Sequence, residues 1–317
     1  MSRPPTFRST TNSGVALALC AAFALAGCGG SASRPIPYAA PQVRGPSSPS
    51  PSKIQHVVII VQENRSFDNL FADFPHADGA TYGLNSKGKK VPLAKRPLFE
   101  HYDIPHGHAA FSIEYDNRKM DGFDKVLIGN PPMPAGNYPY QYADPATIAP
   151  YWAMAKRYVL ADEMFQTQTS GSYTAHQDLI AGGTAVTSDA SVIDVPTGVP
   201  WGCDAPNGTV TSLMTNQGQY EANAGPFPCF TYATLRDSLD NAGLSWRFYT
   251  PAVVVGTGGA WWSSFDSIHA VRYGPEWHKN VISPAPAILT DLKNGSLANV
   301  TWVIPDSPYS DHAGGAH

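Results

Sequence analysis

Residues 54–64 read IQHVVIIVQEN and are the most informative stretch of the chain for its fold. The centre of this stretch, Val57 to Val61, is an unbroken run of β-branched residues, typical of a parallel strand that is covered on both faces. The run is followed at once by Glu63 and Asn64. We therefore expect a buried parallel strand with polar, functional residues at its carboxyl end.

Strands and helices are expected to alternate along the rest of the chain. Apolar runs predict strands at residues 158–160, 244–249 and 301–304, and helical patterns predict helices at 147–157, 175–181, 231–243 and 287–293. Thr231 is the expected N-cap of the helix that Gly243 ends. This alternation predicts an α/β fold with a mostly parallel central sheet flanked by helices.

The N-terminal residues differ in composition from the rest. An apolar stretch preceded by Arg3 and Arg8 ends in Leu25-Ala26-Gly27-Cys28, which predicts a lipoprotein signal peptide over residues 1–27 and lipidation of Cys28. Residues 28–53 are rich in Pro and Ser and predict an extended tether. We therefore expect the protein at the bacterial cell envelope, anchored to the membrane by lipid and facing the periplasm or the exterior.

Residues 54–317 are expected to form one domain, with a loop-rich insertion at 184–228. The insertion region is Gly-, Pro- and Asn-rich and shows little periodicity. The predicted mature chain contains Cys203 and Cys229 besides Cys28, and in an oxidising compartment these two could form a disulfide. A formal net charge of -4 and the lack of a Lys/Arg cluster argue against nucleic acid as a partner.

Two segments after expected strands carry candidate chemistry, and each has a simpler explanation. Glu63 and Asn64 offer oxygen ligands for a divalent cation, but Asn64 or Ser66 could instead cap a short helix, with Glu63 solvated. Ser172 lies in a hydroxyl-rich turn before a helix, where an anion and an alkoxide would both be stabilised. The alternative there is an ordinary capping turn.

Two histidine-containing segments add weaker candidates. Residues 103–108 read DIPHGH, so His106 and His108 could bind a metal or a phosphoryl oxygen, although surface histidine pairs are common. Residues 310–312 read SDH and follow an expected strand. Asp311 could bind a metal or fix the tautomer of His312.

Taken together and in order, these segments resemble a bacterial phosphoesterase family. That family contains the non-haemolytic-type phospholipases C and the AcpA-like acid phosphatases, which share an alkaline-phosphatase-like α/β fold. The stretches that carry the resemblance are HVVIIVQENRSFDNLF, DIPHGHAAFSIEYDNRKMDGFD, TSGSYTAHQDLIAGG, FTYATLRDSLDNAGLSWRFY and TWVIPDSPYSDH. They extend from His56 to His312, and ENRSFD and KMDGF are the most specific.

The resemblance implies a metal-assisted hydrolase of phosphate esters or phospholipid head groups. It places a divalent cation, of unknown identity, on Glu63 and Asn64, and assigns Ser172 as a metal-bound nucleophile that forms a phosphoseryl intermediate. His106 and His312 would contact the phosphoryl group or the leaving oxygen. His108 and Asp311 are expected to assist substrate binding.

The chain also departs from the family pattern. Gly171, Thr174 and Ala175 replace two prolines and an asparagine around the nucleophile. The Asp-Asp pair that completes the family's metal site does not occur before His317, so we expect a C-terminally truncated chain with an exposed sheet edge near Trp302. A non-catalytic envelope lipoprotein that keeps the fold is the alternative function.

Overall fold

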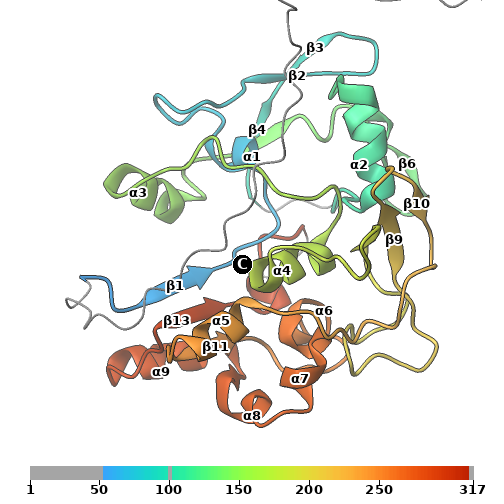
Figure 1. The fold of residues 1–317 in the computed structure, drawn as a ribbon. Coiled ribbons are helices and arrows are strands. Elements are labelled where there is room, and N and C mark those ends of the chain that lie inside the picture. Colours follow the sequence, from blue (N-terminus) through green and yellow to red (C-terminus); the bar gives the residue numbers. More distant parts are fainter. Residues whose placement is uncertain (1–52, 99–101, 314–317) are drawn as a thin grey trace, which may run out of the picture. The chain divides into compact units, whose positions relative to one another are not determined.

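A computed structural model of the protein describes residues 53–98 and 102–313 (Figure 1). The predicted signal peptide over 1–27, Cys28 and the predicted tether, except for Lys53, lie outside the described residues, so these assignments stay predictions. None of the helices in the two described ranges combines the length and the apolar character needed to cross a bilayer.

The central sheet is parallel, as predicted. Its four strands follow the order β1 (Val57–Ile60), β13 (Val300–Val303), β11 (Trp246–Tyr249) and β12 (Val281–Ile282). All three pairings are parallel, and Val300 of β13 is in register with both Val57 and Trp246. Together with the helices around it, the sheet makes a mixed α/β fold.

The prediction of a strand covered on both faces is wrong for β1. In the described part of the chain β1 pairs with β13 alone, and Val57, Val58 and Ile60 are 46%, 40% and 67% exposed. An apolar run predicts a strand but does not say whether the strand lies at the centre or the edge of a sheet. The expected exposed edge near Trp302 is also wrong, because β13 is an inner strand and Trp302 is fully buried.

One apolar core joins the sheet to the helices of the C-terminal half. Aromatic rings dominate it, with Phe265 packed against Trp246, Phe248 and Trp302. Burying such rings is a large part of what stabilises a fold of this size. The core residues are Ile180, Leu239, Trp246, Phe248, Trp262, Phe265, Ile268, Val271, Trp302 and Ile304.

All four predicted helices are present, but α4 begins at Ser172 rather than Ala175 and α5 begins at Leu235 rather than near Thr231. The predicted helices correspond to α3 (Ala149–Arg157), α4 (Ser172–Ala181), α5 (Leu235–Asn241) and α9 (Ile288–Lys293). Thr231 is not the N-cap of α5, because Thr234 forms a capping box with Asp237 instead. The predicted strand at 158–160 is absent: Tyr158 is the C-cap of α3, and Val159 is 87% exposed.

Shorter elements complete the described part of the chain. The N-terminal half contains α1 (Phe67–Phe71), β2 (Tyr82–Leu84), β3 (Lys90–Pro92), β4 (Ala94–Arg96), α2 (His108–Tyr115), β5 (Leu127–Ile128), β6 (Met133–Pro134) and β7 (Gln141–Ala143). The C-terminal half adds α6 (Gly259–Trp262), the 3-10 turn η3 (Ser264–Ser267), α7 (His269–Arg272) and α8 (Glu276–Asn280).

The insertion at 184–228 is more ordered than its composition predicts. It contains a three-stranded antiparallel sheet of β8 (Ala190–Ile193), β9 (Ser212–Thr215) and β10 (Tyr220–Glu221). Loops still connect these strands. The sequence lacked a clear period because β9 and β10 are short and the strands are separated by long, Gly- and Pro-containing connections.

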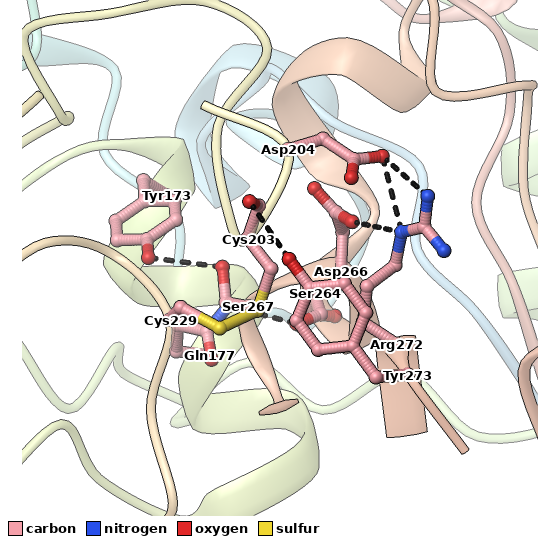
Figure 2. Close-up of a disulfide and its surroundings, with 10 residues drawn as sticks. All are labelled: Tyr173, Gln177, Cys203, Asp204, Cys229, Ser264, Asp266, Ser267, Arg272 and Tyr273. Carbon is pink, nitrogen blue, oxygen red and sulfur yellow. Dashed lines mark hydrogen bonds and ion pairs between the residues drawn. A yellow bond between two sulfur atoms is a disulfide. The ribbon is translucent and has the colours of Figure 1, made fainter. Parts of the chain in front are cut away.

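A disulfide joins Cys203, within this insertion, to Cys229, which directly follows it (Figure 2). The backbone amide of Cys203 donates to the carbonyl of Asp266 in η3, and the amide of Phe230 donates to the carbonyl of Ser267 in the same turn. Helix α4 contacts the same turn, because Tyr173 bonds Ser267 at 3.0 Å and Gln177 donates to the carbonyl of Ser264 at 3.2 Å. The disulfide-closed segment and α4 therefore share η3 as a common support.

Asp266 is the buried charged group of this support. Its side chain is fully buried and ion-paired with Arg272 at 3.1 Å, close to Asp204 (Figure 2). Burial and the negative charge of Asp204 raise the pKa of Asp266 to about 7, although Arg272 opposes this shift. A carboxyl group in an unfolded chain has a pKa of about 4.

The raised pKa of Asp266 predicts a stability that falls as pH rises. Between about pH 4 and pH 7 the folded state keeps the Asp266 proton while the unfolded chain loses it, so rising pH favours unfolding. Above pH 7 the full penalty applies, on the order of a few kcal/mol. Asp266→Asn should flatten the decline in melting temperature between pH 5 and pH 8. Equal declines in both proteins would contradict the assignment.

Candidate functional site

Ser172 is the first residue of α4 and directly follows the hydroxyl-rich turn. The N-cap of α4 is Gly171, whose backbone is extended, and no side chain caps the helix. The alternative explanation of this segment, an ordinary capping turn, therefore has no side-chain cap to support it. The N-terminus of this ten-residue helix concentrates unpaired backbone N–H groups, which favour an anion. Ser172 therefore lies where a phosphate group would be stabilised.

Glu63 comes from the carboxyl end of β1 and faces Ser172. The Ser172 hydroxyl donates to Glu63 Oε2 at 3.0 Å, and His176 Nε2 lies 3.3 Å from Glu63 Oε1. Burial raises the pKa of Glu63, but the hydrogen bond and charge of His176, with His312 and the Ser172 hydroxyl, outweigh burial and hold that pKa below its ordinary value. Glu63 is therefore an ionised acceptor for the Ser172 proton.

The simpler explanation of residues 63–71, a helix cap with Glu63 solvated, is correct for the cap but not for Glu63. Ser66 caps α1, because its Oγ accepts from the amide of Asn69. Glu63 is not simply solvated, since both of its oxygens have partners on α4. A helix cap and a functional carboxylate therefore coexist in one short segment.

His176 belongs to the site although the sequence assigned it no role. It follows Ser172 by four residues, so both side chains lie on one face of α4. The His176 ring is 2% exposed and stacks on Trp262 with ring centroids 6.3 Å apart. The i, i+4 spacing of Ser172 and His176 was the available signal, but a buried partner such as Glu63 is visible only in the fold.

Across from Ser172, three side chains converge on one point. One ligand atom from each of Asp103, His106 and His312 lies within 4.8 Å of the others, a separation that a bound metal ion could bridge with small adjustments. Asn64 joins this group, because its amide donates to Asp103 Oδ1 at 3.2 Å. The predicted residues Glu63, Asn64, Ser172, His106 and His312 are thus brought to one region.

His312 is held in a fixed orientation. Its Nδ1 lies 2.8 Å from the Ser310 hydroxyl, and its ring stacks on Trp262 with centroids 5.3 Å apart. Burial lowers the pKa of His312, and the opposing attraction of Glu63 and Asp103 does not offset this effect. His312 is therefore neutral near pH 7 and able to accept a proton.

Two cavities meet at Asn64 and His106. One, of about 380 Å³, is lined by Glu63, Ser172 and His106, among others. The second, of about 230 Å³, shares Asn64 and His106 with the first and extends between Tyr102, Phe123 and Tyr138. Glu114 lines both cavities, and burial raises its pKa to about 7 against the lowering effect of His106.

His108 and Asp311 are engaged elsewhere. His108 Nδ1 lies 3.1 Å from both the carbonyl and the hydroxyl of Thr169. Asp311 is buried and accepts the Tyr151 hydroxyl at 2.8 Å, while its backbone amide donates to the Glu63 carbonyl. Neither residue lines the two cavities described above, so their expected contact with substrate stays a prediction.

Comparison with known proteins identifies a family. A profile of the Phosphoesterase family matches residues 54–317. The chain is also similar to phospholipase C B from two strains of Mycobacterium tuberculosis, with 24% identity over 302 residues in each case. The alignments cover 84% of this chain and 53% of each relative, so the chain spans about half the length of the curated relatives it matches.

Proposed function

Since the chain belongs to the phosphoesterase family, as its motifs predicted, we propose that it hydrolyses phosphate esters with Ser172 as the nucleophile. The observation that carries this proposal is the Ser172 hydroxyl at a helix N-terminus, hydrogen-bonded to the ionised carboxylate of Glu63. An acceptor at 3.0 Å can take the hydroxyl proton, and the helix N-terminus can hold the phosphoryl oxygens.

The proposed reaction has two displacement steps at phosphorus. In the first, Ser172 Oγ passes its proton to Glu63 and forms a bond to phosphorus, while the bond from phosphorus to the leaving oxygen breaks. The leaving oxygen departs as the alcohol with the proton that Glu63 accepted, and phosphoserine remains. In the second, water attacks the phosphoserine and restores the Ser172 hydroxyl. We assign to neutral His312 the transfer of a proton from that water to Ser172 Oγ, and to His106 a contact with the phosphoryl or leaving oxygen.

The same residues fit a divalent cation. Two neighbouring ligands of an octahedral ion with bonds of about 2.1 Å lie about 3.0 Å apart, which is the separation of Ser172 Oγ and Glu63 Oε2. Glu63 and Ser172 would therefore hold the ion, with Asn64 as the further ligand that the family resemblance implies. Bound there, a cation would neutralise the phosphate and lower the pKa of the Ser172 hydroxyl.

Asp103, His106 and His312 form a second donor set beside the first. Their two imidazoles suit a transition-metal ion better than Mg²⁺ or Ca²⁺. We assign the catalytic cation to the Glu63 set, because that set contains the nucleophile. His106 and His312 then remain available for proton transfer.

The substrate we propose is a phosphate ester or a phospholipid head group. The activity for which the two relatives are named, phospholipase C, supports a phosphodiester. The cavity between Tyr102, Phe123 and Tyr138 has room for the organic part of such an ester beside the phosphate position. We also propose that the parallel sheet belongs to an alkaline-phosphatase-like fold, which the order of the family's motifs supports.

The proposal is tested by assaying the full-length gene product with a chromogenic phosphate monoester and a chromogenic phosphodiester. We expect release of the chromophore from at least one ester, loss of that activity on treatment with chelator, and recovery with added divalent cation. Absence of turnover in both assays with Mg²⁺, Ca²⁺, Mn²⁺ and Zn²⁺ supplied would favour the alternative, a non-catalytic envelope protein that keeps the fold.

A further inference from the structure

We propose that Asp194, in the insertion, is a positioning residue that holds the His106 loop against the Ser172 loop. Asp194 directly follows β8 and is far in sequence from both loops. Its catalytic consequence rests on the function proposed above, whereas its contacts do not. The residue would give the insertion a defined role in the site.

One carboxylate oxygen of Asp194 ties the two loops together. Its Oδ1 accepts from the backbone amide of His108 at 2.6 Å and from the hydroxyl of Ser170 at 2.8 Å. The amide of Asp194 donates back to the same hydroxyl at 2.8 Å. Ser170 is buried, so this reciprocal pair replaces the water that its hydroxyl would otherwise bind.

The two residues bonded to Asp194 stand two positions from the reacting side chains. His108 follows His106 by two residues, and Ser170 precedes Ser172 by two residues. The loops also touch directly, because a Cβ atom on Gly171 would lie 3.5 Å from both the ring and the carbonyl of His106. A shift of either loop would therefore change the distance between His106 and Ser172.

The local backbone is built around this carboxylate. Asp194 adopts a left-handed conformation with φ 59°, which is uncommon for a residue other than glycine. A Cβ atom on Gly107 would lie only 3.2 Å from Asp194 Oδ1, so glycine permits the close approach. Gly107 is the N-cap of α2 and supplies no side-chain cap, so Asp194 provides the anionic acceptor at that helix N-terminus.

The second oxygen of Asp194 supplies a matched control. Oδ2 accepts the Tyr220 hydroxyl at 3.0 Å, from β10. Tyr220→Phe removes this bond but keeps the ring that stacks on His108 with centroids 5.2 Å apart. Asp194→Asn keeps an oxygen able to accept from His108 and Ser170, and asparagine tolerates the left-handed backbone.

The experiment measures turnover and amide hydrogen exchange in the full-length protein. Asp194→Ala should lower kcat about 10- to 100-fold with a smaller change in KM, because misplacing a reacting group by about 1 Å has an effect of that order. Exchange should rise in peptides covering residues 104–112 and 166–174. Asp194→Asn and Tyr220→Phe should stay within about threefold of the wild-type kcat and show no comparable rise.

The exchange data test the positioning role of Asp194 independently of the proposed function. A wild type without turnover would refute the hydrolase proposal. Amide hydrogen exchange in the two loops of Asp194→Ala would still support or overturn the positioning role of Asp194. Unchanged exchange in both loops, or a Tyr220→Phe effect on kcat as large as that of Asp194→Ala, would overturn the assignment of Asp194. A loss of melting temperature with normal kcat would show a purely structural residue and would overturn it as well.

Discussion

Replacing Ser172 with alanine is expected to lower kcat for phosphate-ester hydrolysis at least about a thousandfold while the protein stays folded. The loss follows because no phosphoseryl intermediate can form without the Ser172 hydroxyl. The effect on folding should be small, since Ser172 is only partly buried and does not cap α4. Steady-state kinetics and thermal unfolding of the same preparation measure the two effects.

A matched serine and an isolated intermediate make this prediction specific. Ser188→Ala, in an exposed turn of the insertion, should keep wild-type activity. Acid quenching of the wild type with a ³²P-labelled ester should trap label on the peptide that contains Ser172, and the Ser172→Ala protein should trap none. Label on Thr169, or a Ser172→Ala enzyme with near-normal kcat, would move the nucleophile elsewhere in the hydroxyl-rich turn.

Local sequence predicted three of the four strands of the sheet but neither β12 nor the strand order. The apolar runs at Trp246–Tyr249 and Val300–Val303 predicted β11 and β13, and the run before Glu63 predicted β1. Whether a strand is inner or outer depends on pairing with segments far along the chain. The Val57–Val61 run therefore indicated a covered strand, whereas β1 lies at an edge of the described sheet.

Residues of the candidate site could be predicted from the sequence where they follow parallel strands. Glu63 follows β1 and His312 follows β13, and the pairing of these strands brings the two residues to one end of the sheet. His176 and Asp194 could not be assigned a role in this way. Each owes its place to a partner that is distant in sequence, namely Glu63 for His176 and the two loops for Asp194.

Replacing Glu63 with glutamine tests both the proton acceptor and the proposed cation site. Glutamine keeps the size of the side chain but removes the negative charge that the lowered pKa of Glu63 maintains. The NH₂ group of glutamine would face either Ser172 or His176. In the wild type each of these residues faces a carboxylate oxygen of Glu63, which accepts hydrogen bonds. We expect kcat to fall about 100- to 1,000-fold, the range expected for loss of a general base, and metal binding to weaken.

Asp103→Asn distinguishes the two donor sets, because Asp103 belongs to the second set and does not contact Ser172 or Glu63 among the described residues. With the cation on Glu63, Asn64 and Ser172, titration with Mn²⁺ should show weaker binding in Glu63→Gln and near wild-type binding in Asp103→Asn. The exposed Glu221→Gln on β10 should match the wild type in both binding and turnover. The reverse pattern, with binding lost in Asp103→Asn and kept in Glu63→Gln, would place the cation on Asp103, His106 and His312 and leave Glu63 as the proton acceptor of Ser172 alone.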